Sequence, residues 1–503
     1  MDKETSSKLS DFLKALSLSN LLMDSIITED KQVNGITYNS KTVKRGSIFV
    51  CKGKSFKREY LIEAVNNGAI AYVSEEDYNA PIPFIKVTDI RKAMPVMGKV
   101  FFGKPYDKLK VVGITGTKGK TTTLIFLKNI IDNYLSSFGK KTAYSSTIGN
   151  YNGIENEIAI NTTGESFELF NNLNKAVKAT SPYFLMEVSS QALKYRRADL
   201  INFEIGAFLN LGIDHISDAE HENFEDYFKS KLKIFSQSRR ALINMDSNYI
   251  DEIVDAAKVC NDVVFFSTHN EKANVYAKNS ISKNGNTEFD VVIHNIKGYS
   301  YQAGHITLKI MGMFNIQNAL AAIALGAMLN IPFENIINGL SIADVPGRME
   351  LIYSKDNKKM GIVDFAHNSI SYDALFSAIT YEYPNRKIIL CAGSKGNKAY
   401  SRRRIIAEFT DKYCSHIIIT EDDFNNEDVY SICNEIASYL KVCKSYDIIP
   451  NREDAIKAAV KMASDDNIIV IVGRGIKKLM VRNGKNEFER SDTEIMREEM
   501  SKI

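Results

Sequence analysis

The stretch from Gly113 to Thr123, GITGTKGKTTT, combines glycines, a lysine and threonines in an arrangement that suits phosphate binding. Residues 110–112 before it predict the start of a buried strand, and the mostly apolar residues 124–131 after it predict a helix. Backbone N–H groups in a glycine turn and at a helix N-terminus attract anionic oxygens. The Lys120 ammonium adds a full charge, and the Thr121 hydroxyl can bind Mg²⁺.

The spacing of this loop departs from the common pattern G-x-x-x-x-G-K-[ST]. The residue five positions before Gly119 is Ile114, and glycines stand instead at Gly113 and Gly116. The stretch therefore predicts a nucleotide site. The alternative is an ordinary strand-to-helix turn that carries an exposed lysine.

Polar side chains also follow two other predicted strands. Glu187 lies near the end of the strand 183–188, while Asn210 and then Asp214-His215 follow the strand 204–209. In open α/β sheets, ligands bind at the carboxyl ends of the strands. These groups are therefore expected to share one rim with the phosphate loop.

The rest of the chain predicts an α/β fold in three domains. Residues 1–106 predict a small α/β domain, and Pro105 marks a linker before the phosphate-loop strand. In residues 107–345 strands alternate with helices, which is typical of a central P-loop ATPase-type domain with a mostly parallel sheet. Beyond Val345-Pro346-Gly347, residues 346–503 predict a Rossmann-like, doubly wound domain without its own phosphate loop.

Composition narrows the class of protein. The chain has 503 residues, 44% of them hydrophobic and 25% charged, with a net charge of +3. This balance gives no support for a nucleic-acid or membrane surface, and no apolar run approaches the roughly 20 residues that span a bilayer. Six scattered cysteines and a polar, mixed-charge N-terminus predict reduced thiols in a cytoplasmic protein.

The chain resembles the Mur ligase family, the ATP-dependent amino-acid ligases of peptidoglycan precursor synthesis. The resemblance covers essentially the whole chain and is greatest to the enzymes that extend UDP-N-acetylmuramoyl-L-alanyl-D-glutamate by the third residue of the stem peptide. The matching stretches are GTKGKTT (116–122), NTTGES (161–166), MEVSSQAL (186–193), FLNLGIDH (208–215), EDYFKSKLKIF (225–235), FNIQNALAA (314–322), VPGRME (345–350), VDFAHN (363–368) and GNKAYSRRR (396–404).

The resemblance implies that ATP phosphorylates the substrate carboxylate and that an amine attacks the resulting acyl phosphate. It implies an ATP site at Gly116, Thr117, Lys118, Gly119, Lys120, Thr121, Thr122, Asn318, Arg348, Asp364 and His367. It also implies Mg²⁺ near Thr121, with Glu187 helping to hold one ion and His215 a second. Instead of binding Mg²⁺, Glu187 at the strand end could serve as a cap or as an ion-pair partner. For Asn318 and its neighbour Asn315, the alternative is capping the start of an Ala-rich helix.

Lys231 has a special role in the family. The pattern Glu225-x-Tyr227-x-x-x-Lys231 resembles the site at which CO₂ carbamylates a lysine and turns a cation into an anionic oxygen ligand for Mg²⁺. Lys229 and Lys233 flank this position without matching it. The alternative is a solvated lysine on a helix surface. The implied catalytic set is therefore Lys120, Glu187, His215 and Lys231.

The family match also implies where the UDP-muramoyl-dipeptide binds, across the first and second domains. The implied contacts are Ser40, Phe56, Lys57, Thr162, Thr163, Ser189 and Arg197. Two positions depart from the family. Gln191 replaces a frequent His and receives no role here, and Phe365 replaces the usual Tyr, so a hydroxyl contact is absent there.

The third domain is expected to select the incoming amino acid. Asp422-Asp423-Phe424-Asn425 resembles the Asp-Asp-Pro-Asn of lysine-adding enzymes, whereas diaminopimelate-adding enzymes carry Asp-Asn-Pro-Arg. Without that Arg, a second carboxylate would be poorly paired and costly to bury. The resemblance implies L-lysine, with Lys398 at the α-carboxylate and Asp422 at the ammonium. L-Ornithine and meso-diaminopimelate remain alternatives.

Two hypotheses from other classes remain beside the ligase. The first hypothesis is a P-loop NTPase that drives conformational work. The second is a non-catalytic relative that acts as an interaction module. The presence of Lys120, Thr121, Glu187 and His215 together favours the ligase. We expect a monomer with no nucleic-acid or membrane partner.

Overall fold

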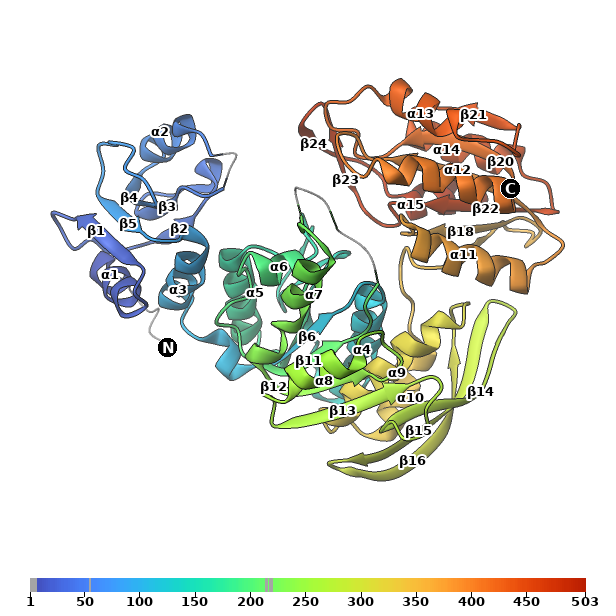
Figure 1. The fold of residues 1–503 in the computed structure, drawn as a ribbon, viewed down its shortest axis with the longest axis horizontal. Coiled ribbons are helices and arrows are strands. Elements are labelled where there is room, and N and C mark those ends of the chain that lie inside the picture. The colour runs from blue at the N-terminus through green and yellow to red at the C-terminus, as the bar shows by residue number, and fades with distance from the viewer. Residues whose placement is uncertain (1–6, 54–55, 213–215, 217–219) are drawn as a thin grey trace. The chain divides into compact units, whose positions relative to one another are not determined.

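The computed structural model describes residues 7–53, 56–212, 216 and 220–503. The chain divides into two compact units. One contains residues 1–117, 135–243 and 247–264, and the other contains residues 118–134, 244–246 and 265–503. Figure 1 shows helices packed against the sheets within each part. The predicted α/β class is confirmed, whereas the boundaries at 106/107 and 345/346 stay a prediction.

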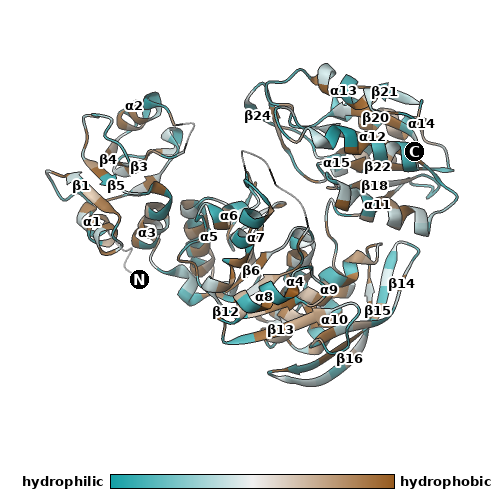
Figure 2. Cartoon of the chain, in the orientation of Figure 1, coloured by the Kyte–Doolittle hydropathy of each residue, from teal (hydrophilic) through white to brown (hydrophobic). Residues whose placement is uncertain are grey.

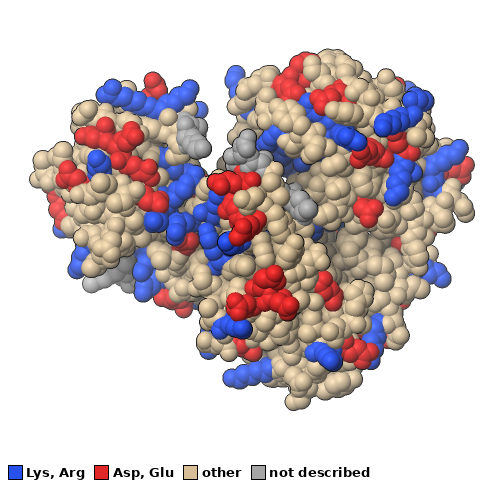
Figure 3. Space-filling view, in the orientation of Figure 1, with Lys and Arg blue, Asp and Glu red and all other residues tan. Residues whose placement is uncertain are grey.

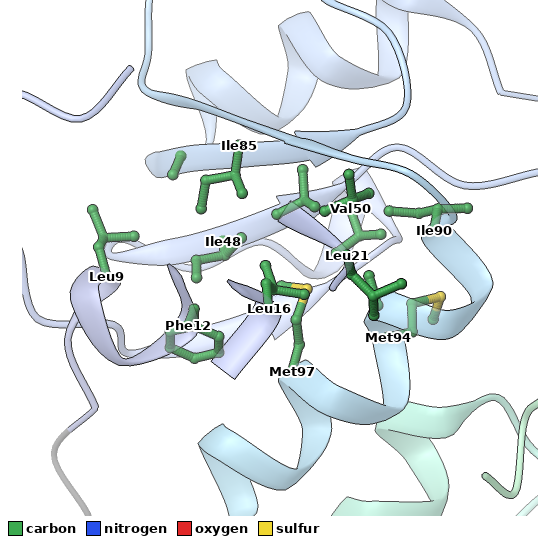
Figure 4. Packing of buried hydrophobic residues seen from close by; sticks show 14 of the residues in the cluster. Leu9, Phe12, Leu16, Leu21, Ile48, Val50, Ile85, Ile90, Met94 and Met97 are labelled. Carbon is green, nitrogen blue, oxygen red and sulfur yellow. The ribbon is translucent and has the colours of Figure 1, made fainter. Parts of the chain in front are cut away.

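The N-terminal sheet has the strand order β1-β5-β4-β3-β2, in which β1 alone runs antiparallel to its neighbour. Buried side chains of two helices, including Phe12 and Met97, pack on strand residues such as Ile48 (Figure 4). The elements are α1 (Leu9–Leu18), β1 (Leu22–Ile26), β2 (Gly35–Thr37), β3 (Ser47–Val50), α2 (Arg58–Asn66), β4 (Ala69–Ser74), β5 (Phe84–Val87) and α3 (Ile90–Phe102).

The remainder of the first unit contains a parallel run of strands, β12-β11-β6-β10-β7, followed by the antiparallel β8 and β9. Because the run is parallel, the carboxyl ends of β6, β10 and β11 meet at one edge. The elements are β6 (Lys110–Thr115), β7 (Ala143–Ser146), β8 (Gly149–Tyr151), β9 (Asn156–Glu157), α5 (Ser166–Lys178), β10 (Tyr183–Glu187), α6 (Ser190–Lys194), β11 (Phe203–Phe208), α7 (Phe224–Leu232), β12 (Ser238–Asn244) and α8 (Ile250–Ala257).

The second unit contains an antiparallel meander that the alternating strand–helix pattern does not predict. β14 pairs with β15 and β15 with β16, all antiparallel, and the turn between the first two contains Asn284 and Gly285, both at positive φ. An Asn-Gly pair between two strands is a strong signal for a β-hairpin, so the sequence does contain an indication of this hairpin. The elements are α4 (Lys120–Leu135), β13 (Asp262–Ser267), β14 (Val275–Lys283), β15 (Asn286–Ile296), β16 (Tyr299–Leu308), α9 (Phe314–Met328) and α10 (Phe333–Ser341).

Gly339 on α10 lies against the backbone of α4. A Cβ added there would lie 2.5 Å from Ile130 Cα, so Gly339→Ala is expected to destabilise the protein by about 1–3 kcal/mol through overpacking. Gly326→Ala on α9 is the matched control, because its Cβ meets only side-chain atoms of Ile130 and Ile336 at 3.3 Å. Urea denaturation measures both variants. Equal midpoints would contradict the close approach of these helices.

The C-terminal sheet has the order β17-β18-β22-β19-β20-β21, with β17 antiparallel and the others parallel. This is the predicted doubly wound pattern, and Figure 2 shows hydrophobic residues along its strands. The elements are β17 (Glu350–Tyr353), β18 (Met360–Asp364), α11 (Ser369–Glu382), β19 (Lys387–Ser394), α12 (Ser401–Tyr413), β20 (Cys414–Glu421), α13 (Val429–Ser438), β21 (Tyr446–Ile448), α14 (Arg452–Met462), β22 (Asn467–Val472), β23 (Leu479–Arg482), β24 (Lys485–Phe488) and α15 (Asp492–Met500).

All six cysteines are free thiols, as the sequence predicts. Burial raises the pKa of each thiol, to about 12 for Cys51, Cys391 and Cys433. On the face drawn in Figure 3, groups of basic and groups of acidic side chains both occur among uncharged residues. None of the described helices combines the length and the apolarity that crossing a membrane requires.

Candidate active site

Lys231 is buried beside the phosphate loop in the first unit. Its side chain on α7 is 1% exposed, and its Nζ donates to the carbonyl oxygen of Gly116 at 2.9 Å. The same ammonium lies 4.7 Å from the ring centroid of Tyr227, one helical turn away. Lys229 is 70% exposed in its side chain and pairs with Glu225. Lys231 is thus a buried group, and the solvated-lysine alternative describes Lys229 instead.

The start of the phosphate loop is tied to the segment after β11. Thr117 N donates to Asn210 O at 3.0 Å, and Thr117 Oγ1 accepts from Gly212 N at 2.9 Å. The same hydroxyl lies 2.9 Å from the hydroxyl of Tyr227 on α7. The loop is therefore held by both the strand that precedes α7 and by α7 itself.

Glu187 ends β10 and is 1% exposed. Its Oε1 accepts from the Ser146 hydroxyl and from Thr147 N at 2.9 Å, and its Oε2 accepts from Thr147 Oγ1 at 3.2 Å. Thr147 Oγ1 also lies 3.1 Å from Thr162 Oγ1. The predicted Glu187 and Thr162 thus belong to one cluster, joined through a threonine that the sequence argument misses.

Thr163 links this cluster to α6. Its hydroxyl donates to Glu187 O at 2.9 Å and accepts from Ser189 N at 3.0 Å, while Ser189 caps α6 by accepting from Ala192 N. The Arg197 guanidinium donates to Thr163 O at 3.3 Å. The structure therefore brings together Thr162, Thr163, Glu187, Ser189 and Arg197.

The oxygen donors in this cluster fit Mg²⁺ rather than a transition metal. In the described part of the chain, no group of three or more His, Cys, Asp or Glu side chains is arranged to hold a metal ion. Mg²⁺ typically takes one or two carboxylates together with water and substrate phosphates. Glu187 and the neighbouring hydroxyls supply such ligands, whereas the Lys231 amine is a donor and would bind a cation only after conversion to a carbamate. The predicted ligand His215 lies outside the described residues.

A Ser–His–Asp chain lies beside this cluster and was not predicted. His221 is fully buried, with Nε2 3.0 Å from Ser190 Oγ and Nδ1 2.9 Å from Asp226 Oδ2, and Lys194 Nζ lies 2.7 Å from the same Asp226 oxygen. Ser190 is 3% exposed, so the chain of contacts does not present a nucleophile to solvent. It fixes α6 against α7.

The predicted uridine contacts lie in the N-terminal part of the first unit. Ser40 is buried and its hydroxyl donates to Glu63 Oε2 at 2.5 Å. Phe56 is half-buried, with its ring centroid 5.0 Å from that of Tyr78, and Lys57 is exposed at the N-terminus of α2. Within the described part of the chain, no hydrogen bond or ion pair joins Ser40, Phe56 or Lys57 to Thr163.

In the second unit, the start of α4 meets the residue that follows Gly347. Arg348 Nη2 donates to Thr121 Oγ1 at 3.3 Å, and the Arg348 guanidinium lies 4.4 Å from the ring centroid of Phe365. Thr121 and Thr122 are both buried, and Gly119 before them has φ 84°, which favours glycine. The predicted Arg348 is therefore brought to the phosphate-loop helix.

Asp364 and His367 lie at the end of β18, as predicted. Asp364 accepts from Met349 N at 2.8 Å and from Ala366 N at 2.6 Å. Burial raises the pKa of this carboxyl above its usual value, although the charges of Arg348 and Lys118 oppose the change. His367 Nδ1 lies 2.8 Å from Phe365 O.

Asn318 is buried on α9, where its amide donates to Asn315 Oδ1 at 3.0 Å. Asn315 in turn donates to Met311 O at 2.8 Å. The two side chains therefore bridge the start of the Ala-rich helix α9, which is the structural role expected from the sequence as the alternative to ATP binding. An adenine contact at Asn318 stays a prediction.

Asp422 and Asp423 in the C-terminal part of the chain form ion pairs with arginine and lysine side chains of the same protein. Asp422 is 1% exposed and accepts from Arg474 Nη1 at 2.9 Å and from Arg402 Nη1 at 3.2 Å. Asp423 accepts from the same Arg474 nitrogen at 2.9 Å and from Lys477 Nζ at 2.8 Å. These partners, distant in sequence, could not be read from the local motif.

The other predicted amino-acid contacts flank this ionic cluster. Asn425 adopts φ 53° and its amide donates to Gly396 O at 2.8 Å and Asp423 O at 3.1 Å, so it closes the loop after β20. Lys398 is exposed in the adjacent loop after β19. Both positions stay predictions for the amino-acid site.

Asp422→Asn is expected to lower stability by about 2 kcal/mol at pH 7. Burial raises the pKa of Asp422, but Lys395, Arg474 and Arg402 outweigh it and hold the pKa well below its usual range. A depressed pKa contributes stability above the unfolded value of about 3.9, and this contribution declines as the pH falls toward the folded value. Urea midpoints at pH 7 and pH 3 should therefore differ less for the variant than for the wild type. The exposed Asp465→Asn is the control, and a parallel loss in all three proteins would contradict the assignment.

Comparison with known proteins settles the family. The Mur ligase middle domain matches residues 114–326, and the domain described as "Mur ligase, glutamate ligase domain" matches residues 347–475. The chain belongs to the Mur ligase family. The resemblance seen in the sequence is confirmed.

Relatives of this Mur ligase match along almost its whole length. It is 34% identical over 472 residues to the UDP-N-acetylmuramoyl-L-alanyl-D-glutamate--L-lysine ligase of Streptococcus pneumoniae serotype 4 (strain ATCC BAA-334 / TIGR4), covering 92% of each chain. It is 34% identical over 468 residues to the UDP-N-acetylmuramyl-tripeptide synthetase of Lactococcus lactis subsp. cremoris (strain SK11), covering 91% of each.

Solved structures share the fold of this Mur ligase. A UDP-N-acetylmuramoyl-L-alanyl-D-glutamate--2,6-diaminopimelate ligase superposes with a TM-score of 0.62 at 22% identity, covering 94% of this chain and 96% of that one. MurF from Thermotoga maritima in complex with ADP gives a TM-score of 0.63 at 16% identity, covering 92% and 97%. At these identities the likeness supports the fold alone.

Proposed function

We propose that this Mur ligase uses ATP to join L-lysine to UDP-N-acetylmuramoyl-L-alanyl-D-glutamate, releasing ADP, in cytoplasmic peptidoglycan precursor synthesis. The observation that carries the proposal is the 34% identity over 92% of the chain to enzymes named for that reaction. A phosphate loop before α4, the buried carboxylate of Glu187 and the buried Lys231 support the proposal.

Phosphoryl transfer between two anions requires positioning and neutralisation of charge. Lys120 and the N–H groups at the start of α4 bind the ATP phosphates, and Arg348, held at Thr121 by a 3.3 Å contact, adds a second cation. Asp364, His367 and Asn318 complete the nucleotide site in this proposal. When bound, Mg²⁺ supplies a Lewis acid that neutralises the phosphate oxygens, and Thr121, Glu187, His215 and Lys231 are the proposed residues that hold it.

Lys231 acts as a carbamate in this proposal. At its buried position next to Gly116, an unmodified ammonium would repel a bound Mg²⁺ ion, whereas an anionic carbamate would bind it. The carbamate forms when the neutral amine attacks CO₂ and loses a proton. The nearby hydroxyls and Glu187 remain as oxygen ligands.

The substrates are divided among the three proposed domains. Residues 1–106 hold the UDP-muramoyl part through Ser40, Phe56 and Lys57, residues 107–345 hold ATP, and residues 346–503 hold the amino acid through Lys398, Asp422, Asp423 and Asn425. Thr162, Thr163, Ser189 and Arg197 orient the dipeptide so that its reacting carboxylate meets the γ-phosphate. The neutral α-amine of the amino acid then attacks the acyl phosphate and forms the amide, and inorganic phosphate leaves together with a proton from the amine. The protein acts as a monomer in this proposal.

Release of ADP measured with UDP-N-acetylmuramoyl-L-alanyl-D-glutamate and each of three amino acids tests the proposal. L-Lysine should give a kcat/KM about tenfold or more above L-ornithine, which is one methylene shorter, and meso-diaminopimelate should give little turnover. Turnover with diaminopimelate but not lysine would overturn the specificity. ADP release that needs no amino acid would identify an NTPase, and no release at all would favour the interaction module.

A further inference from the structure

His221 is a buried histidine that joins two helices of the first unit. It precedes α7, and its side chain is fully buried. Its Nε2 lies 3.0 Å from Ser190 Oγ at the start of α6, and its Nδ1 lies 2.9 Å from Asp226 Oδ2 on α7. The imidazole is therefore held from both sides of its ring.

Asp226 determines which ring nitrogen carries the proton. Lys194 Nζ lies 2.7 Å from the same Asp226 oxygen that contacts the imidazole. Burial raises the pKa of Asp226, but hydrogen bonds from Lys194 and His221 outweigh it and hold the pKa below its usual value. The carboxylate is thus an acceptor whose charge Lys194 already offsets. A neutral imidazole fits this place, with Nδ1–H as the donor and Nε2 as the acceptor of the Ser190 hydroxyl.

The imidazole also contacts Tyr227, which reaches both the phosphate loop and Lys231. The centroids of the histidine and tyrosine rings lie 5.3 Å apart with the ring planes at 77°, an edge-to-face arrangement that aromatic rings prefer. The Tyr227 hydroxyl lies 2.9 Å from Thr117 Oγ1, and Lys231 Nζ lies 4.7 Å from the centroid of the tyrosine ring. Tyr227 is fully buried, so a different orientation of its ring would change the surroundings of both groups.

The Nε2 contact of the imidazole leads to the cluster around Glu187. Ser190 follows Ser189, whose N–H donates to Thr163 Oγ1 at 3.0 Å. That hydroxyl donates to Glu187 O at 2.9 Å. His221 therefore lies between two groups of site residues, one at the end of β10 and the other on α7.

We infer that His221 is a positioning residue for ligation, which orients Tyr227 so that Lys231 stays beside the phosphate loop. The inference rests on the proposed function, in which Lys231 carries a carbamate that binds the metal ion. A lysine that leaves this place part of the time binds CO₂ there only in the remaining fraction, so its apparent affinity for CO₂ falls by that fraction. Loss of the imidazole is therefore expected to lower the occupancy of the carbamate.

The test measures ligation as ADP release while bicarbonate is varied from CO₂-depleted buffer to saturation. His221→Asn keeps a donor for Asp226 but removes the ring from Tyr227. It should raise the half-saturating concentration of bicarbonate about tenfold or more, and excess bicarbonate should restore much of the rate. His305→Asn is the matched control and should leave that concentration unchanged. His305 Nδ1 also lies 2.9 Å from an aspartate, Asp290, but the His305 side chain is 58% exposed.

A purely structural role for His221 predicts a different result. Partial unfolding lowers the amount of active protein at every concentration of bicarbonate and leaves the half-saturating concentration unchanged. The carbamate signal in ¹³C NMR, measured per folded protein below saturation, should fall in His221→Asn. If this variant does not fold, Ser190→Ala carries the test, because it removes only the Nε2 contact. It should raise the half-saturating concentration about fivefold, the loss of one neutral hydrogen bond.

The outcomes separate this inference from the proposed function. Wild-type protein that ligates without any dependence on bicarbonate and gives no carbamate signal would overturn the carbamate and, with it, the inference. Wild-type protein that requires bicarbonate, together with an unchanged half-saturating concentration in the folded variant, would overturn only the role of His221. Equal shifts in His221→Asn and His305→Asn would overturn that role as well.

Discussion

Lys231→Ala is expected to lower the rate of ligation by about a hundredfold to a thousandfold, the loss that follows removal of one preorganised group from an active site. The reason is the position of Lys231, which is 1% exposed and contacts the carbonyl oxygen of Gly116 in the phosphate loop at 2.9 Å. The measurement is ADP release with saturating substrates. A thermal denaturation curve for each variant separates loss of activity from loss of fold.

Two further variants show what kind of group Lys231 is. Lys229→Ala is the matched control, because Lys229 is exposed on the same helix and should keep full activity. Lys231→Arg retains a cation but does not form the carbamate, so it should be as inactive as the alanine variant. An active arginine variant would mean that Lys231 works as a cation. A carbamate signal in ¹³C NMR with labelled bicarbonate, present in the wild type and absent in Lys231→Arg, is the direct measurement.

Arg452→Met is expected to lower the free energy of unfolding by about 3–5 kcal/mol, the usual cost of breaking a buried ion pair from one side. Arg452 at the start of α14 is 3% exposed and contacts Asp492 through Nε at 2.7 Å and Nη2 at 2.8 Å. Its remaining donors reach Glu421 O at 3.0 Å and Val472 O at 2.7 Å. The variant would therefore leave a buried carboxylate and two carbonyl groups without their partner.

Urea denaturation measures this loss, with Arg404→Met as the control. Arg404 on α12 forms a 2.8 Å pair with Glu408, but both side chains are more than half exposed, so the control should change stability by less than about 0.5 kcal/mol. The double variant Arg452→Met/Asp492→Asn should recover part of the loss, since it no longer buries an unpaired charge. Equal stability of the two single variants would contradict the proposed role of the buried pair.

Local sequence patterns predict much of this fold. The predicted strand 183–188 is β10 (Tyr183–Glu187), and the predicted helix 124–131 lies within α4 (Lys120–Leu135). These elements are marked by mostly apolar runs. The meander β14–β16 is not predicted, because a regular alternation of strands and helices is assumed over residues 107–345. The turn residues of that stretch indicate hairpins instead.

The candidate site also contains some features that the sequence predicts and others that it does not. The phosphate loop and Glu187 are found from the sequence because each lies at the end of a recognisable strand, and the family resemblance singles out Lys231. By contrast, the ion pairs of Arg474 with Asp422 and of Lys52 with Glu165 join residues 52 and 113 positions apart. Nothing in the local sequence fixes which of the many lysines and arginines meets which carboxylate, since that choice is made by tertiary packing.

The chemistry of the cysteines gives a practical route to measuring how this chain moves. A thiol reacts as its thiolate, and burial raises the pKa of all six native thiols, so they should react slowly with maleimides near neutral pH. A cysteine introduced at an exposed position in each compact unit would then take up a fluorophore selectively, with no need to remove the native residues. Energy transfer between two such dyes would report the distance between the units in solution, with and without substrates.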